Sequence, residues 1–241
     1  MKIEADDMYF QELNEEVRSA SDTEIQIDQC LGQRYIGAGL SGKKIIISGT
    51  PGNALGAYLD GSDITVYGNA QDATGDTMNG GTISIFGSSG DATGYAMRGG
   101  KIFVRDSIGY RAGIHMKAYQ EKIPKIVVGG CAGSFLGEYQ AGGVIIVLGL
   151  HRKASAPLVG HFCGTGMHGG EMFLRTDTLP SDMPAQVKAE DASSKDLDSI
   201  RPLLQEFCSK FGENLKDILG SHFFKLTPDS TNPYKALYTA N

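Results

Sequence analysis

Seven glycines mark a repeating unit that fills most of this 241-residue chain. The first five are separated by 19 residues, and the next two gaps are 24 and 27 residues, at Gly37, Gly56, Gly75, Gly94, Gly113, Gly137 and Gly164. A second glycine follows most of them five residues later, at Gly42, Gly61, Gly80, Gly99, Gly142 and Gly169. A fixed period of this size indicates stacked units that bury one another's apolar residues. We therefore expect these glycines to serve backbone geometry rather than chemistry.

Each unit also carries a short alternating apolar run, such as Ile64–Val66 or Ile83–Ile85, which fits a strand of a few residues. The fourth position of the unit is apolar except at Gln140, as in Leu40, Leu59, Met78, Met97, Met116 and Met167. Helical and Trp-Asp repeat patterns are absent, which excludes tetratricopeptide, ankyrin, leucine-rich and WD40 repeats. The pattern predicts an all-β solenoid, a parallel β-helix of about seven coils.

Three segments are expected around this repeat. Residues 1–31 form an N-terminal cap segment, with one amphipathic helix near Phe10, Leu13 and Val17 and then a strand from Glu24 to Cys30. Residues 32–176 form the repeat body. Residues 177–241 form a linker rich in Ser, Pro and Asp, a helical C-terminal cap and an extended tail. Helices are expected at both ends because the end of a solenoid exposes unpaired strand edges.

Composition narrows the classes of function. The net charge is −6, so the chain has no overall basic field for nucleic acid or an anionic membrane. No signal-peptide stretch and no membrane-spanning apolar run is found, which predicts a cytoplasmic protein. Its cysteines are widely spaced, without a zinc, iron–sulfur or disulfide pattern, at Cys30, Cys131, Cys163 and Cys208. We expect no cofactor and no metal.

Individual candidates for chemistry all have a plainer explanation. The glycines lack the G-x-x-x-x-G-K-[ST] pattern of a phosphate loop, and no helix follows them. Cys131 and Cys163 suit a packed core better than a nucleophilic site, although His161 is two residues from Cys163. His115 and His168 hold neighbouring register positions two units apart, about 10 Å, which is too far for one metal ion. We therefore predict no catalytic, cofactor-binding or metal site.

The carboxylates do not predict a carbohydrate-cleaving ladder. They are interpreted as scattered over different register positions, at Asp60, Asp63, Asp72, Asp76 and Asp91, while Asp106 suits a turn. A free-standing polysaccharide-acting enzyme is accordingly the less favoured alternative.

Two basic insertions interrupt the repeat. One lies between Met116 and Ile126 and the other follows Gly149, and their cations are Lys117, Lys122, Lys125, Arg152 and Lys153. They are either solvated loops or a docking surface for an acidic partner.

The aligned motif resembles the GXGXG domain, the right-handed β-helix at the C-terminal end of the large subunit of glutamate synthase. The stretch Gly32–Gly42 is similar to the start of that family's first coil, and Gly75–Gly81 and Gly94–Gly100 are similar to its typical coils. The closing run Phe224–Tyr238 is similar to the tail of stand-alone versions.

The resemblance implies a role in assembly. In glutamate synthase, an amidotransferase domain releases ammonia and a barrel with FMN and an iron–sulfur centre uses it, while the β-helix performs neither reaction. It implies a non-catalytic scaffolding subunit of a split glutamate synthase-type oxidoreductase, with amidotransferase and FMN/iron–sulfur subunits as partners and no activity alone. The family also includes one of the subunits of formylmethanofuran dehydrogenase, so a structural subunit of such a complex is the alternative. A self-associating assembly module also stays open.

Overall fold

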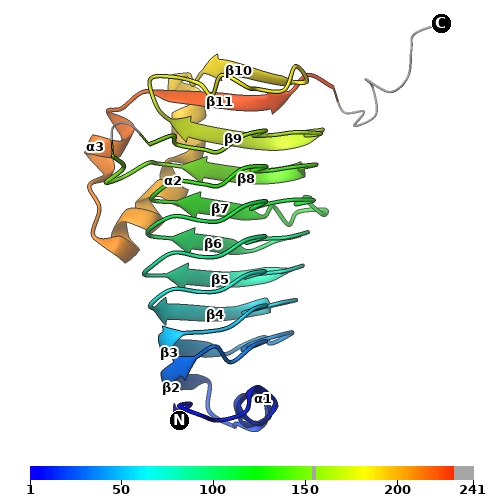
Figure 1. Ribbon diagram of the computed structural model, residues 1–241, viewed down its shortest axis with the longest axis vertical. Helices are drawn as coiled ribbons and strands as arrows, with labels where there is room; N and C mark the ends of the chain where they lie inside the picture. Colours follow the sequence, from blue (N-terminus) through cyan, green and yellow to red (C-terminus); the bar gives the residue numbers. More distant parts are fainter. Residues whose placement is uncertain (154–155, 231–241) are drawn as a thin grey trace, which may run out of the picture.

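One sheet runs through the whole molecule (Figure 1). The computed structural model describes residues 1–153 and 156–230, and its 11 strands lie in the order β1-β2-β3-β4-β5-β6-β7-β8-β9-β11-β10. Strands β1 to β9 are parallel, and β11 and β10 complete the sheet in antiparallel pairing. The strands are β1 (Lys2–Glu4), β2 (Glu24–Leu31), β3 (Lys44–Thr50), β4 (Asp60–Tyr67), β5 (Gly80–Ile85), β6 (Lys101–Val104), β7 (Lys125–Val128), β8 (Ala141–Val147), β9 (Gly169–Arg175), β10 (Val187–Asp191) and β11 (Phe223–Pro228).

Three helices accompany the sheet in the described part of the chain: α1 (Phe10–Ser19), α2 (Ser194–Phe211) and α3 (Leu215–Leu219). The expected amphipathic helix is confirmed as α1, which buries Leu13 and Val17 near the N-terminal end of the sheet. None of these helices is long and apolar enough to cross a membrane.

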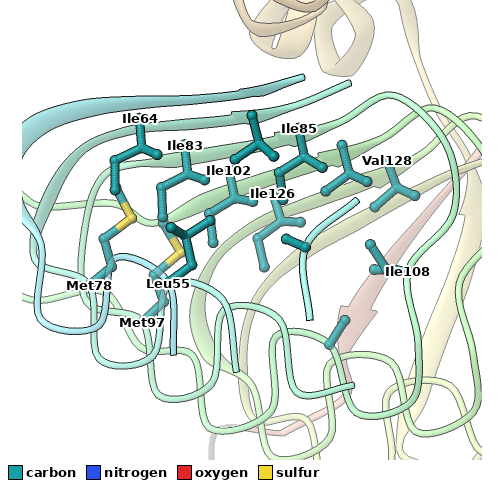
Figure 2. Packing of buried hydrophobic residues seen from close by; sticks show 14 of the residues in the cluster. Leu55, Ile64, Met78, Ile83, Ile85, Met97, Ile102, Ile108, Ile126 and Val128 are labelled. Carbon is teal, nitrogen blue, oxygen red and sulfur yellow. The ribbon is translucent and has the colours of Figure 1, made fainter. Parts of the chain in front are cut away.

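The repeat sets the register between neighbouring strands. Ile64 pairs with Ile83 and Ile83 with Ile102, one unit further along each time. Figure 2 shows Ile64, Ile83, Ile102 and Ile126 in one row, with Met78 opposite them. All five side chains are almost completely buried. Burial of one such side chain stabilises the fold by about 1.5–3 kcal/mol, so each added unit extends the core.

In the first five units, the first glycine lies in a turn that approaches this row of core isoleucines so closely that no side chain has room there. Gly75 has a φ of +70°, and a Cβ built on it would lie 2.5 Å from Ile102 Cδ1, in the strand of the next unit. Gly94 meets Ile126 Cδ1 at the same distance. A side chain at either position would therefore be strained by its backbone and would also collide with the core.

Helix α2 lies against the outer face of the sheet. The residue between the two inward positions is apolar and buried in four consecutive strands, as Phe103, Val127, Ile146 and Phe173. These side chains pack in one cluster with the apolar side of α2, including Leu204 and Phe207. The equivalent residues Gln26 and Thr65 in β2 and β4 are polar, and α2 does not cover them. The outer face is thus apolar in all the strands that the helix covers, although Ile46 in β3 is apolar without being part of this cluster.

The predicted fold class, a right-handed parallel β-helix of about seven coils with helical N- and C-terminal caps, is wrong. The described strands form one open, mostly parallel sheet, and α2 covers its face instead of its C-terminal end (Figure 1). That end consists of β11 and β10, which pair beyond β9 and occupy its free hydrogen-bonding edge.

Two predictions about the segment after residue 176 are also wrong in part. Strand β10 lies in the segment expected to be a linker, and β11 lies where the extended tail was expected to begin. The rest of that tail, residues 231–241, lies outside the described residues. The segment boundaries at residues 31 and 176 stay a prediction.

His222 joins three segments at this C-terminal end. Its Nδ1 lies 2.8 Å from the carbonyl oxygen of Thr176, just after β9, and its Nε2 lies 3.0 Å from Asp191 Oδ1 in β10. Both nitrogens can donate only when the ring is protonated. The bond to Thr176, followed by the bond to Asp191, therefore raises the pKa of His222 above its usual 6.5.

We expect His222→Gln to destabilise the protein in a pH-dependent way. Because the folded pKa is raised, the stabilising contribution is fully present below the unfolded value of 6.5 and is lost as the pH rises through the folded pKa. The difference in melting temperature between wild type and variant should be larger at about pH 5.5 than at about pH 8.5. Thermal unfolding over this range measures it. Asp191→Asn should weaken the same dependence, and a pH-independent difference would contradict the assignment.

Candidate functional site

Of the two candidate nucleophiles, Cys163 is buried and Cys131 is half-buried. Burial raises the pKa of Cys163 to about 12, and it also raises the pKa of the half-buried Cys131. The His161 ring is 78% exposed, and its Nδ1 lies 2.8 Å from Asp182 Oδ2. His161 is thus paired with a carboxylate rather than with the sulfur of Cys163. This hydrogen bond lowers the pKa of Asp182. The arrangement supports a packing role for both cysteines.

We expect Cys163 to resist a thiol reagent in the folded protein, because a buried thiol with a raised pKa supplies almost no thiolate. Mass spectrometry after brief alkylation near neutral pH should find Cys163 unmodified, and full modification should require denaturant. Cys131, which is half-buried, should react faster than Cys163 under the same conditions and serves as the internal control. Rapid labelling of Cys163 in the native state would instead indicate an accessible, activated sulfur.

The candidate histidines are not brought together. The His115 ring stacks on Tyr139 with 5.4 Å between centroids, whereas His168 Nδ1 lies 3.0 Å from the carbonyl oxygen of Gly166. Within residues 1–153 and 156–230, no three His, Cys, Asp or Glu side chains gather as a metal site requires.

The carboxylates differ in one respect from the prediction of scattered register positions. Asp72 and Asp91 share one position in successive units, and each accepts a backbone N–H from the next unit through Oδ1, at 2.9 Å from Asp91 and 2.8 Å from Tyr110. Elsewhere, Asp60 pairs with Lys122 at 3.3 Å, and Asp76 accepts the hydroxyl of Thr77. These contacts give the carboxylates structural partners at the turns.

The two basic insertions lie at opposite ends of the parallel strands. The first, with Lys117 and Lys122, precedes β7 and the second, with Arg152, follows β8. Arg152 donates through Nη1 to the carbonyl oxygen of Ala156 at 2.7 Å. Lys125 is the first residue of β7, and Lys153 is exposed. The insertions therefore belong to separate surfaces, and their role in docking stays a prediction.

A cavity of about 220 Å³ lies beside the second insertion. Its walls are largely apolar, with Leu158, Leu174 and Leu179, and Arg152 and the His161–Asp182 pair complete them. No cysteine is among the residues that line this cavity, and the bond between His161 Nδ1 and Asp182 holds the imidazole ring in one orientation at its wall.

Our reading of the sequence missed an aromatic surface on the turn-rich face, opposite the sheet. Two ladders of backbone hydrogen bonds stack the turns there. In the first, the N–H groups of Ala54, Ala73, Ala92, Arg111 and Phe135 each donate to the next unit. In the second, the donors are Tyr58, Thr77, Ala96, His115 and Tyr139. The signal lies two residues before and two residues after each repeat glycine. The first of these columns reads Tyr35, Ala54, Ala73, Ala92, Arg111, Phe135 and Phe162, and the second reads Gly39, Tyr58, Thr77, Ala96, His115, Tyr139 and Gly166.

Comparison with known proteins places these features in context. The GXGXG motif family matches residues 12–229. Uncharacterized protein MJ1350 of Methanocaldococcus jannaschii is 43% identical over 249 residues, covering 98% of this chain and 95% of the relative. Among solved structures, a chain of the formyltransferase/hydrolase complex of Methylorubrum extorquens, in complex with methylofuran, is similar with a TM-score of 0.67 and 22% identity. The two structures match over 87% of the present chain and 75% of the other chain. At this sequence identity, the match shows that the two chains share a fold.

Proposed function

Because the chain belongs to the GXGXG motif family, we propose that it is a structural subunit of a multi-subunit complex of the formylmethanofuran dehydrogenase type. The observation that carries this proposal is the likeness in fold to a chain of a formyl-group complex that holds methylofuran. The family match alone fits a glutamate synthase scaffold equally well. The solved structure therefore favours the formyl-group alternative over the glutamate synthase reading.

The chemistry of the described side chains supports a structural role. Cys163 is buried, and its strongly raised pKa leaves almost no thiolate. The first five repeat glycines face core isoleucines, with Gly75 against Ile102 as the example above. A chain built in this way offers a rigid, extended surface on which catalytic subunits can assemble.

Co-purification from the native cell tests the proposal. A tagged chain expressed at its natural level should recover subunits of a formylmethanofuran dehydrogenase or formyltransferase/hydrolase type, identified by mass spectrometry. The isolated chain should show no formyl-transfer, glutaminase or glutamate-forming activity. Recovery of an amidotransferase together with an FMN-binding polypeptide would overturn the proposal in favour of the glutamate synthase reading. Recovery of no other polypeptide would contradict both.

A further inference from the structure

The cavity beside the second insertion is lined in part by the main core. Leu158 and Leu174 line it, and both are buried members of the cluster that runs through the repeat. Leu179, from the segment between β9 and β10, also lines it and packs against the same cluster. These side chains present apolar surface to a space of about 220 Å³. An apolar cavity of about 150 Å³ is large enough to bind benzene, so this space has room for a ring or a branched aliphatic chain.

Arg152 brings a positive charge to the same cavity. Its Nη1 donates to the carbonyl oxygen of Ala156 at 2.7 Å, which orients the side chain without neutralising it. Among residues 1–153 and 156–230, no carboxylate forms an ion pair with Arg152. A guanidinium has five N–H donors in a planar fork, and a carboxylate is the group that matches two of them at once. The cavity therefore holds a cation that an anionic ligand can neutralise.

The carboxylate that lines this cavity already has two donors of its own. Asp182 Oδ2 accepts from His161 Nδ1 at 2.8 Å and from the backbone N–H of Phe162 at 3.2 Å. These bonds fix the imidazole ring, and because that ring is largely exposed, it lies where the cavity meets solvent. In the described part of the chain, His161 Nε2 forms no hydrogen bond, so it is available to a polar group of a ligand.

We propose that this cavity binds a small carboxylic acid that carries an apolar chain or ring. The carboxylate lies against the guanidinium of Arg152, and the apolar part lies among the three leucines. Apolar walls with a few placed polar groups are the usual composition of a small-molecule site. A purely polar anion would leave the leucine surface without a partner, and a neutral apolar molecule would leave Arg152 without a counter-charge. This inference does not depend on the proposed function.

Two acids of different shape, 4-methylpentanoate and phenylacetate, serve as probes of the full chain. Isothermal titration calorimetry should give a Kd below about 1 mM for at least one of them. Its amide, which has the same shape without the charge, and acetate, which has the charge without the apolar part, should each bind at least about tenfold more weakly. Failure of both acids to bind overturns the proposal. Equal binding of the amide or of acetate overturns the assigned ligand class.

Arg152→Gln separates the charge contact from the shape of the cavity. This variant should bind the acid at least about tenfold more weakly and should no longer prefer it to the amide. A collapsed cavity would instead weaken acid and amide alike and leave their ratio unchanged. Lys153→Gln removes the same charge from the adjacent exposed residue and is the matched control, with wild-type binding expected. A preserved preference for the acid in Arg152→Gln contradicts the role of Arg152.

Methyl NMR of leucine-labelled protein locates the bound acid. The methyl resonances of Leu158, Leu174 and Leu179 should shift on titration, because these groups line the cavity. Those of Leu204, in the separate cluster beneath α2, should stay in place and serve as the internal control. Shifts confined to leucines outside the cavity would place the acid elsewhere and overturn the proposal.

Discussion

Replacing Gly75 with alanine should lower the free energy of unfolding by about 2–5 kcal/mol. The backbone contributes about 1–2 kcal/mol of this, because Gly75 has a φ of +70°. Overpacking contributes another ~1–3 kcal/mol, because the new Cβ would lie 2.5 Å from Ile102 Cδ1 in a fully buried row. Urea unfolding followed by circular dichroism measures the change.

Gly42→Ala is the matched control for this prediction. Gly42 has nearly the same φ, +69°, but a Cβ there would meet nothing within 4 Å. We expect only the backbone cost of about 1–2 kcal/mol. Equal losses in the two variants would show that the close approach to Ile102 does not matter, and that the repeat glycine is needed for its backbone angle alone.

Replacing Phe207 with alanine should cost about 3–5 kcal/mol, the usual range for removing a fully buried phenylalanine. Phe207 is 0% exposed and lies in the cluster between α2 and the sheet, together with Phe103 and Phe173. Its loss leaves a cavity at the centre of that contact. Besides lowering the free energy of unfolding, the change should expose residues 194–211 to limited proteolysis before the strands are cleaved.

Gln205→Ala provides the control on the same helix. Gln205 is exposed, and alanine is a good helix former, so the free energy of unfolding should change by no more than about 0.5 kcal/mol. Early cleavage of α2 in this variant would indicate that the helix is held weakly whatever its buried face contains. Retention of α2 in the Phe207 variant would show that its remaining contacts, such as buried Leu204 and the ion pair of Lys225 with Asp196 at 2.8 Å, are sufficient to hold it.

The repeated parts of the fold were predictable, because the same pattern of glycines and apolar residues occurs in nearly every unit. The strand positions Ile64, Ile83 and Ile102 were identified by alternation, and the structure pairs them in that register. The position of α2 was predicted wrongly, as a cap on the C-terminal end, because its apolar stripe could cover either an end or a face of the sheet. The deciding signal was the residue between the inward positions, which is apolar in β6 and β9 as Phe103 and Phe173. That column follows no repeat pattern, since it also holds Gln26, Thr65 and Ser84.

The surface features were harder to predict for a different reason. The repeat pattern consists of the glycines and the apolar core positions, whereas the aromatic surface occupies two columns beside them, at Phe135 and Tyr139 for example. The partner of His161 could not be inferred at all. Asp182 lies beyond the repeat, in a segment without periodicity, and only the folded chain brings it within 2.8 Å.

The covering of the sheet by α2 has a consequence for synthesis of the chain on the ribosome. Phe103 precedes Phe207 by 104 residues, so the outer face of β6 exists before its cover has been made. The ribosome adds about 5–20 residues per second, so Phe207 is synthesised about 5–20 s after Phe103. The interval between Phe173 and Phe207 is shorter. During that time a growing row of apolar side chains is open to solvent. The nascent C-terminal half is therefore the stage at which this protein is most exposed to aggregation or to capture by a chaperone.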